Sequence, residues 1–249
     1  MNTFTLKLLA LILMTLDHIA LYFPAAPVWF GWLGRTSYPL FLFCLAVGLR
    51  HTRSRGRYIA RLYGMSVFMT LFGLALDHLF PTESGYGNHN IFVPMLLVAV
   101  LVSIWEWLPA APRRAWAALG GLAAVQLAYF VLPALLPPLK MLSGDQLTGL
   151  LPCLGVHEYG FAFVALGVAM YLVQGDRRRL AAVYLLFCLY QFSAELIETG
   201  AAVQWLMVLA LPAMLRYNGR RGPGGWLAKW GFYLYYPLHT AALFLLFHT

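Results

Sequence analysis

Long apolar segments dominate this sequence and limit it to one kind of fold. They recur along the chain at residues 5–23, 28–49, 58–80, 90–108, 115–136, 157–173, 180–197, 200–215 and 226–247. Several approach the roughly 20 apolar residues that an α-helix needs to cross a bilayer. Only 10% of the 249 residues are charged, whereas soluble domains carry about 25%. The sequence therefore predicts an all-α, polytopic transmembrane helix bundle of about nine spans, within a range of eight to ten, as a single domain over residues 1–249.

The loops between these segments predict the orientation of the chain. All of the 17 lysines and arginines except Arg35 and Lys140 fall in alternate loops or at the segment ends that face them. Because loops rich in these residues stay in the cytoplasm, we expect a cytoplasmic N-terminus. The net charge of +8 needs no nucleic-acid partner, which would require basic residues gathered on one soluble face. Segment 137–156 is polar and broken by proline and glycine, which indicates a long loop or a partly re-entrant piece.

Ionisable residues lie within the segments, toward the non-cytoplasmic side. Asp17 and His18 occupy the outer half of the first segment, and Arg35 and His239 lie at a similar depth in the second and ninth. A charge at the centre of a spanning helix costs about 2.5–3.5 kcal/mol on insertion scales. Pairing or a wet cavity offsets this cost, so these residues are candidates for a functional site inside the bundle. A purely structural Asp17–Arg35 ion pair and an ordinary core histidine at position 18 are the alternatives.

These residue types suit proton transfer. An oriented imidazole can take the proton of an attacking hydroxyl or amine. Consecutive residues point about 100° apart on a helix, so Asp17 cannot face His18, and we expect a residue of another helix to pair with His18. Arg35 offers a fixed positive charge for an oxyanion or a carbonyl, and His239 a second acid or base. The histidines show no metal-ligand spacing, and we expect no metal.

Several blocks of sequence have a further meaning when they are taken together. They are spread in order over nearly the whole chain, and they read "LLALILMTLDHIALYF", "WFGWLGRTSYPLFLFCLAVGLRHTRSRGRYIARL", "NHNIFVPMLL", "GVHEYGFAFVAL" and "LPAMLRYNGRRGPGGWLAKWGFYLYYPLH". In these blocks the chain resembles the TraX family, whereas residues 109–152 match nothing in it.

The resemblance implies an integral-membrane acetyltransferase that moves an acetyl group from cytoplasmic acetyl-CoA to an amine or hydroxyl, such as a pilin N-terminus or a glycan. Under it, the acyl-transfer site consists of Asp17, His18, Arg35 and His239. Arginines of the cytoplasmic loops are expected to bind the CoA phosphates by charge-assisted bonds, with a role in topology alone as the alternative: Arg50, Arg53, Arg55, Arg57, Arg220 and Arg221. Residues at the outer ends of two segments are expected to bind the acceptor: Asn88, Asn90, Glu158 and Tyr159.

Two other classes of function stay open from the residues alone. A proton-coupled transporter or flippase would use the buried His, Asp and Arg residues as a relay, but the inverted repeats that such proteins show are not evident. An assembly scaffold gives no reason to bury His18 and Arg35 at matching depth. The expected location is the bacterial inner membrane, in contact with lipid, and the sequence leaves the acceptor and any homo-oligomer undefined.

Overall fold

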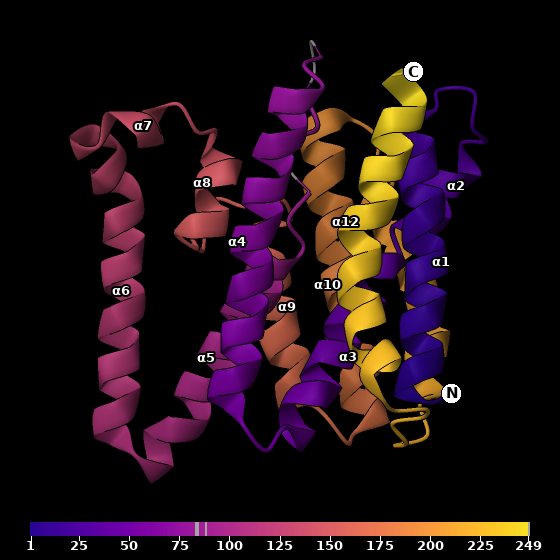
Figure 1. Ribbon diagram of the computed structural model, residues 1–249. Coiled ribbons are helices and arrows are strands. Elements are labelled where there is room, and N and C mark those ends of the chain that lie inside the picture. The colour runs from indigo at the N-terminus through magenta and orange to yellow at the C-terminus, as the bar shows by residue number, and fades with distance from the viewer. Residues whose placement is uncertain (83–84, 88, 249) are drawn as a thin grey trace. The chain divides into compact units, whose positions relative to one another are not determined.

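The described part of the chain is built from helices and contains no strand (Figure 1). The computed structural model describes residues 1–82, 85–87 and 89–248. The chain forms two compact units, of which unit 1 comprises Met1–Gly48 and Ala169–Thr249, and unit 2 comprises Leu49–Val168. The all-α helix bundle is therefore confirmed, while the assignment of residues 1–249 to a single domain stays a prediction.

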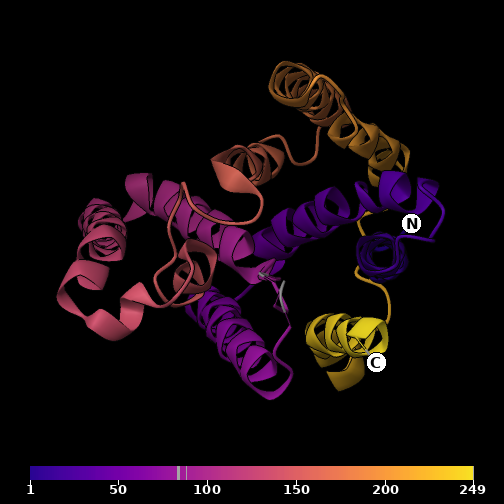
Figure 2. The same ribbon diagram turned by 90° about the horizontal axis from the view of Figure 1, so that it is seen from above.

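Unit 1 contains both ends of the chain. Its helices are α1 (Thr3–Tyr22), α2 (Trp29–Gly34), most of α3 (Ser37–His51), the end of α9 (Gly160–Leu172), α10 (Arg177–Thr199), the 3-10 helix η1 (Gln204–Ala210), α11 (Leu211–Leu215) and α12 (Trp226–His248). Helix α1 packs against α2 and α12, and η1 packs against α2, α10 and α11. Figures 1 and 2 show α1 and α12 side by side, so the first and last helices of the chain are neighbours.

Local sequence explains where two helices of unit 1 begin and end. Asn2 caps α1, because its side-chain oxygen accepts the backbone N–H of Thr5 at 2.8 Å. Helix α10 starts after Asp176, whose side chain accepts the backbone N–H groups of Arg178 and Arg179 in the first turn. It ends at Gly200, whose φ of 74° lies in the left-handed region that favours glycine. The chain therefore leaves α10 in a tight turn and enters η1 a few residues later.

Unit 2 combines long helices with a short helical segment. Its elements are α4 (Arg55–Leu79), α5 (Phe92–Ala110), α6 (Pro112–Leu135), α7 (Pro137–Lys140), α8 (Gly144–Leu150) and the start of α9. Helix α4 packs against α5 and α8, and α5 packs against α6. Most of α5 is buried within the unit, whereas α6 exposes large apolar side chains such as Trp116, Leu127 and Phe130. Such an apolar surface suits a helix that faces lipid tails.

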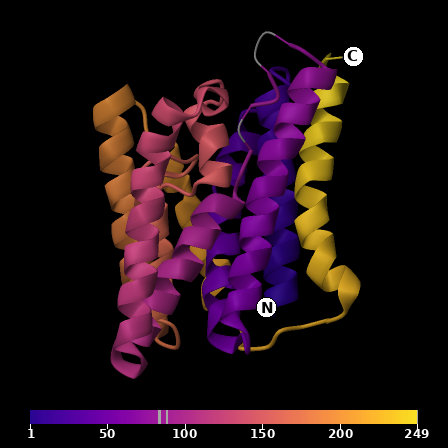
Figure 3. The ribbon, with the colours of Figure 1, turned by 60° about the vertical axis from the view of Figure 1, so that its left-hand side comes forward.

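Helix α8 packs against α4 within unit 2 (Figure 3 shows the ribbon), and three hydroxyl groups attach the two helices. Tyr63, Ser66 and Thr70 follow one another at helical spacing on one face of α4, and each donates to a backbone carbonyl of α8 at 3.0–3.2 Å. A helix leaves its last carbonyls without internal partners, and the bilayer core has no water to replace them. The hydroxyls of α4 supply such partners to carbonyls of α8, including those of Gly149 and Leu150 at its end.

Gly149 permits this close approach of α8 to α4. A Cβ atom at this position would overlap the hydroxyl of Thr70 and would lie 2.8 Å from Nδ2 of Asn90 and 3.1 Å from the carbonyl oxygen of Ser66. The amide of Asn90 in turn donates to that carbonyl at 3.0 Å. The segment 137–156, which the sequence indicates as a loop or a partly re-entrant piece, thus contains two short helices with a polar attachment to the unit.

The helices are compatible with about nine spans. Six of those described are long and apolar enough to cross a membrane: Thr3–Tyr22, Trp29–His51, Arg55–Leu79, Phe92–Ala110, Pro112–Leu135 and Arg177–Thr199. The other three expected segments correspond to α12, to the shorter α9 and to η1 with α11. One detail differs from the expectation, because the second span is interrupted at Arg35 and Thr36, between α2 and α3. The chain is a polytopic helical membrane protein.

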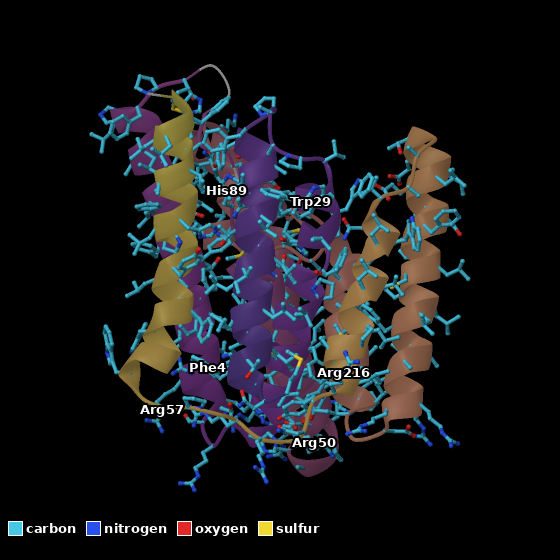
Figure 4. The ribbon with its side chains drawn as sticks, turned by 90° about the vertical axis from the view of Figure 1, so that its right-hand side faces the viewer. Phe4, Trp29, Arg50, Arg57, His89 and Arg216 are labelled. Atoms are coloured by element: carbon cyan, nitrogen blue, oxygen red, sulfur yellow. The ribbon has the colours of Figure 1, made fainter. Side chains whose placement is uncertain are left out.

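Basic residues gather at one end of each unit (Figure 4). In unit 1, Arg216 lies toward the end opposite to Trp29, and in unit 2, Arg50 and Arg57 lie toward the end opposite to His89. These arginines belong to the loops that the sequence assigns to the cytoplasm. The distribution within each unit thus agrees with the alternation of basic loops along the sequence.

Candidate functional site

Two histidines from the first and last helices meet inside unit 1. Nδ1 of His18, on α1, lies 2.6 Å from Nε2 of His239, on α12. Their rings are stacked with centroids 4.8 Å apart and planes inclined by 21°. Only 8% of each residue is exposed. The partner from another helix that the sequence predicts for His18 is therefore His239.

When both imidazole rings are neutral, their hydrogen bonds determine which ring nitrogen of His18 and of His239 carries the proton. Nδ1 of His239 lies 2.7 Å from the backbone carbonyl oxygen of Tyr235, and because a carbonyl only accepts, this nitrogen carries the proton. Nε2 of His239 is then an acceptor, so Nδ1 of His18 donates to it. The second ring nitrogen of His18, Nε2, is consequently unprotonated. His18 is thus held as the tautomer that has its basic nitrogen on the side away from His239.

Tyr235 supports His239 through its ring as well as its backbone. Its ring stacks on the imidazole of His239, with centroids 4.7 Å apart and planes inclined by 15°. The hydroxyl of Thr15 donates to the carbonyl of Leu11 at 2.9 Å, so the phenol of Tyr235, at 2.8 Å from the same hydroxyl, is the donor to Thr15. Thr15 lies on α1, and the two helices therefore meet through the histidine pair and through this second contact.

An ion pair forms where α1 meets α2. Nη2 of Arg35 lies 3.8 Å from Oδ1 of Asp17, with side-chain exposures of 44% for Arg35 and 27% for Asp17. Gly34 allows this approach, because a Cβ atom there would overlap the side chain of Asp17. Since Asp17 and His18 are consecutive, the ion pair and the histidine pair begin at the same level of α1 but on faces about 100° apart. The structure therefore brings the four predicted catalytic residues together as two adjacent pairs within unit 1.

The predicted phosphate-binding arginines of unit 2 differ in how they are engaged. Arg55 forms an ion pair with Glu106 at 2.7 Å, where the guanidinium is largely buried. Arg50, Arg53 and Arg57 are exposed. Arg55 therefore has its charge neutralised within the unit, and the other three present theirs at the surface.

The arginines of unit 1 belong to a loop that pairs with the start of the chain. The backbone carbonyls of Arg220 and Arg221 accept the N–H groups of Thr3 and Phe4 at 2.9 and 3.1 Å. The two guanidinium side chains are exposed. The loop that precedes α12 is thus fixed at the start of α1 through its backbone, which leaves both charged groups at the surface.

The predicted acceptor-binding residues lie in unit 2. The backbone N–H of Asn90 donates to Oε2 of Glu158 at 3.3 Å, so these two are brought together. Tyr159 follows in the connection to α9 and is half-buried. Asn88 lies outside the described residues.

His157 is a further buried ionisable group of unit 2. It precedes α9 and is 8% exposed. Burial lowers the pKa of His157 to about 4, against a smaller opposing contribution from the backbone at Leu154. The imidazole is therefore neutral at physiological pH, which makes it a weak base and a poor partner for an anion.

Sequence reasoning missed the polar residues that surround the two pairs. Gln204 accepts a hydrogen bond from Nη1 of Arg35 at 3.4 Å, and Glu195 accepts the backbone N–H groups of Val203 and Gln204. Tyr235 is recognisable in retrospect, since it precedes His239 by one helical turn. Gln204 carries no comparable signal, because a neutral amide at the start of an apolar segment is common.

The fold and this site define a class of protein: a polytopic helical membrane protein with a buried histidine pair and an adjacent Arg–Asp pair. Residues 3–136 match the family described as "TraX protein". The chain belongs to the TraX family.

A curated relative gives a more distant comparison. The chain is 30% identical over 112 residues to the "Probable fimbrial assembly protein FimC, serogroup H1" of Dichelobacter nodosus. The alignment covers 41% of this chain and 46% of that protein, so it spans less than half of the relative's length. No solved structure matches the chain.

Proposed function

We propose that this protein is an acetyltransferase of the bacterial inner membrane that moves an acetyl group from acetyl-CoA to an amine or hydroxyl acceptor. The observation that carries the proposal is the 2.6 Å contact between His18 and His239. It joins two buried titratable groups that the packing of an apolar bundle does not require. Ionisable residues within spanning helices are costly and are therefore functional candidates by default.

His18 acts as the general base in this proposal. Its unprotonated Nε2 takes the proton from the acceptor N–H or O–H while the acceptor atom attacks the acetyl carbonyl carbon. His239 accepts the hydrogen bond from Nδ1 of His18 and so stabilises the imidazolium that forms on His18. When the carbon–sulfur bond breaks, His18 returns the proton to the leaving sulfur. The products are the acetylated acceptor and the free thiol of coenzyme A.

Arg35 stabilises the negative charge that develops on the carbonyl oxygen. Its guanidinium is permanently charged and presents several N–H donors. It is 44% exposed, so part of it faces outward from its ion pair with Asp17. A donor directed at the oxyanion typically contributes about 10²–10³ in rate.

The donor is held on the cytoplasmic side by exposed arginines. Coenzyme A is polyanionic, and Arg50, Arg53 and Arg57 or Arg220 and Arg221 present guanidinium groups that can bind its phosphates bidentately. We assign Arg55 a structural role instead, because Glu106 neutralises it. On the acceptor side, Asn90, Glu158 and Tyr159 are the proposed contacts.

The acceptor that we favour is a peptide amine. The relative from Dichelobacter nodosus is named a fimbrial assembly protein, and a related role here would make a pilus subunit the acceptor. A glycan amine or hydroxyl is the other acceptor that the same chemistry accommodates.

Purified protein incubated with radiolabelled acetyl-CoA tests the proposal. The expected result is the release of coenzyme A thiol, or label on an added peptide or glycan, in the wild type but not in the variant His18→Ala. Expression and thermal unfolding of the variant establish that it is folded. Full activity of folded His18→Ala would remove the catalytic assignment. If the wild type neither transfers the label nor releases the thiol, that result would favour a proton-coupled transporter.

A further inference from the structure

Arg35 has a second set of contacts beyond its ion pair with Asp17. The separation of 3.8 Å between Nη2 and Oδ1 exceeds the usual length of a charge-assisted hydrogen bond, which is about 2.7–2.9 Å. The side chain is also 44% exposed. Asp17 alone is therefore a loose restraint on a long and flexible side chain.

Gln204 supplies the second restraint, at the other terminal nitrogen of the guanidinium. Nη1 of Arg35 donates to Oε1 of Gln204 at 3.4 Å, while Nη2 faces Asp17. The amide of Gln204 is itself oriented, because its Nε2 lies 3.8 Å from the sulfur of Met207. Its oxygen, the atom that can accept, is thereby directed to Arg35.

Glu195 in turn determines where Gln204 lies. Oε2 of Glu195 accepts the backbone N–H groups of Val203 at 2.6 Å and of Gln204 at 2.7 Å. These are short bonds, and they occupy the N–H groups of Val203, which precedes η1, and of Gln204, its first residue; such N–H groups at a helix start have no partner within the helix. Glu195 is on α10, so it fixes the start of η1 relative to α10.

From these contacts we propose that Gln204 and Glu195 are positioning residues, which hold the guanidinium of Arg35 in place. The catalytic meaning of this inference rests on the proposed acetyl transfer, but the geometric claim does not. The alternative is that Glu195 only caps η1 and that Gln204 has no effect on Arg35. The two differ in what happens to the guanidinium when either residue is changed.

Chemical labelling of Arg35 with phenylglyoxal measures this directly. The reagent modifies guanidinium groups, and mass spectrometry of the purified full-length protein in detergent gives the labelling rate of Arg35 alone. We expect the rate to rise several-fold in Gln204→Leu, which lacks an acceptor, and in Glu195→Ala. Gln204→Glu keeps an acceptor oxygen and should label at about the wild-type rate. Glu198→Gln is the matched control on α10, because Glu198 is exposed and makes no part of this contact chain.

Kinetics with acetyl-CoA separate this inference from the proposed function. We expect Gln204→Leu to lower kcat about tenfold with less than a twofold change in KM for acetyl-CoA, and Gln204→Glu to restore most of the rate. If the labelling rate of Arg35 rises in Gln204→Leu while the wild type shows no acetyl transfer, that outcome would support the positioning role and contradict the proposed function. An unchanged labelling rate of Arg35 in folded Gln204→Leu would overturn the positioning role. If Glu195→Ala fails to fold, Gln204→Leu decides the question.

Discussion

The two units use buried polar groups for different purposes. In unit 2, neutral hydroxyls from Tyr63, Ser66 and Thr70 satisfy backbone carbonyls at the end of α8. In unit 1, the buried contact joins two titratable side chains, His18 and His239, and His239 also bonds to the backbone carbonyl of Tyr235. The first kind of contact supplies partners to backbone carbonyls, whereas the second is made between two ionisable side chains. The difference teaches that a polar group in an apolar bundle indicates chemistry when the backbone does not account for it.

The substitution His239→Ala, which has the largest expected effect, tests whether the buried pair of unit 1 differs in purpose from the polar contacts of unit 2. His18 would lose the acceptor that fixes its tautomer, and we expect acetyl transfer to fall about 10²–10⁴-fold, the range typical of general acid–base groups. His239→Gln retains an amide oxygen that can accept from His18 and should lose less. The measurement is the rate of thiol release from acetyl-CoA.

His248 offers a matched control on the same helix. Its Nδ1 lies 2.8 Å from the carbonyl of Phe244, the same type of contact as that of His239 with Tyr235, but the residue is exposed. His248→Ala should leave the rate unchanged. An equal loss in both variants would show that α12 is sensitive to any substitution and that the pair has no special role.

The second prediction concerns Arg35, the residue of unit 1 that we propose as the donor to the oxyanion. Arg35→Ala removes the proposed oxyanion contact, and we expect kcat to fall about 10²–10³-fold. Arg35→Lys keeps the charge but not the forked geometry and should recover only part of the rate. If Arg35→Ala lowers the unfolding temperature and leaves kcat intact, the Asp17–Arg35 pair is structural, as the polar contacts of unit 2 are.

The third prediction tests the purely structural role in unit 2. Gly149→Ala would place a methyl group against the hydroxyl of Thr70 and the carbonyl of Ser66, and overpacking of this kind destabilises by about 1–3 kcal/mol. The control is Gly121→Ala in α6, where nothing lies within 4 Å of the added atom. Thermal unfolding in detergent measures both. A large stability loss in Gly121→Ala, or none in Gly149→Ala, would contradict the contact between α4 and α8.

The fourth prediction is a pH effect in unit 2. Because the folded-state pKa of His157 is lowered to about 4 from 6.5, the unfolded chain binds this proton more readily than the folded one. The folded protein therefore loses stability as the pH falls from 6.5 toward 4, by on the order of 1 kcal/mol per pH unit. His157→Gln should flatten this part of the profile. Unfolding temperatures measured at several pH values in that interval check the slope, and identical profiles for both proteins would contradict it.

The sequence predicts the parts of the site that are rare in an apolar chain. Asp17, His18, Arg35 and His239 stand out because ionisable residues seldom occur within spanning segments, and common depth alone suggests that they meet. The alternation of basic loops likewise predicts orientation, since it depends on local composition.

The remaining features depend on contacts between distant segments. Gln204 is 169 residues from Arg35, and neither residue type nor spacing predicts that they touch. The same holds for Tyr63, whose hydroxyl reaches a carbonyl 87 residues away. Hydroxyl and amide side chains are common at segment ends, so their partners become identifiable only when the helices are packed.

The pairing of the first and last helices has a consequence for synthesis of the protein. His239 follows His18 by 221 residues, so every other described helix is made before the two rings can meet. During membrane insertion, α1 therefore enters the bilayer with His18 lacking its eventual partner, and the proposed base is completed only when α12 arrives. Nascent chains would then lack the completed histidine pair until α12 has been made.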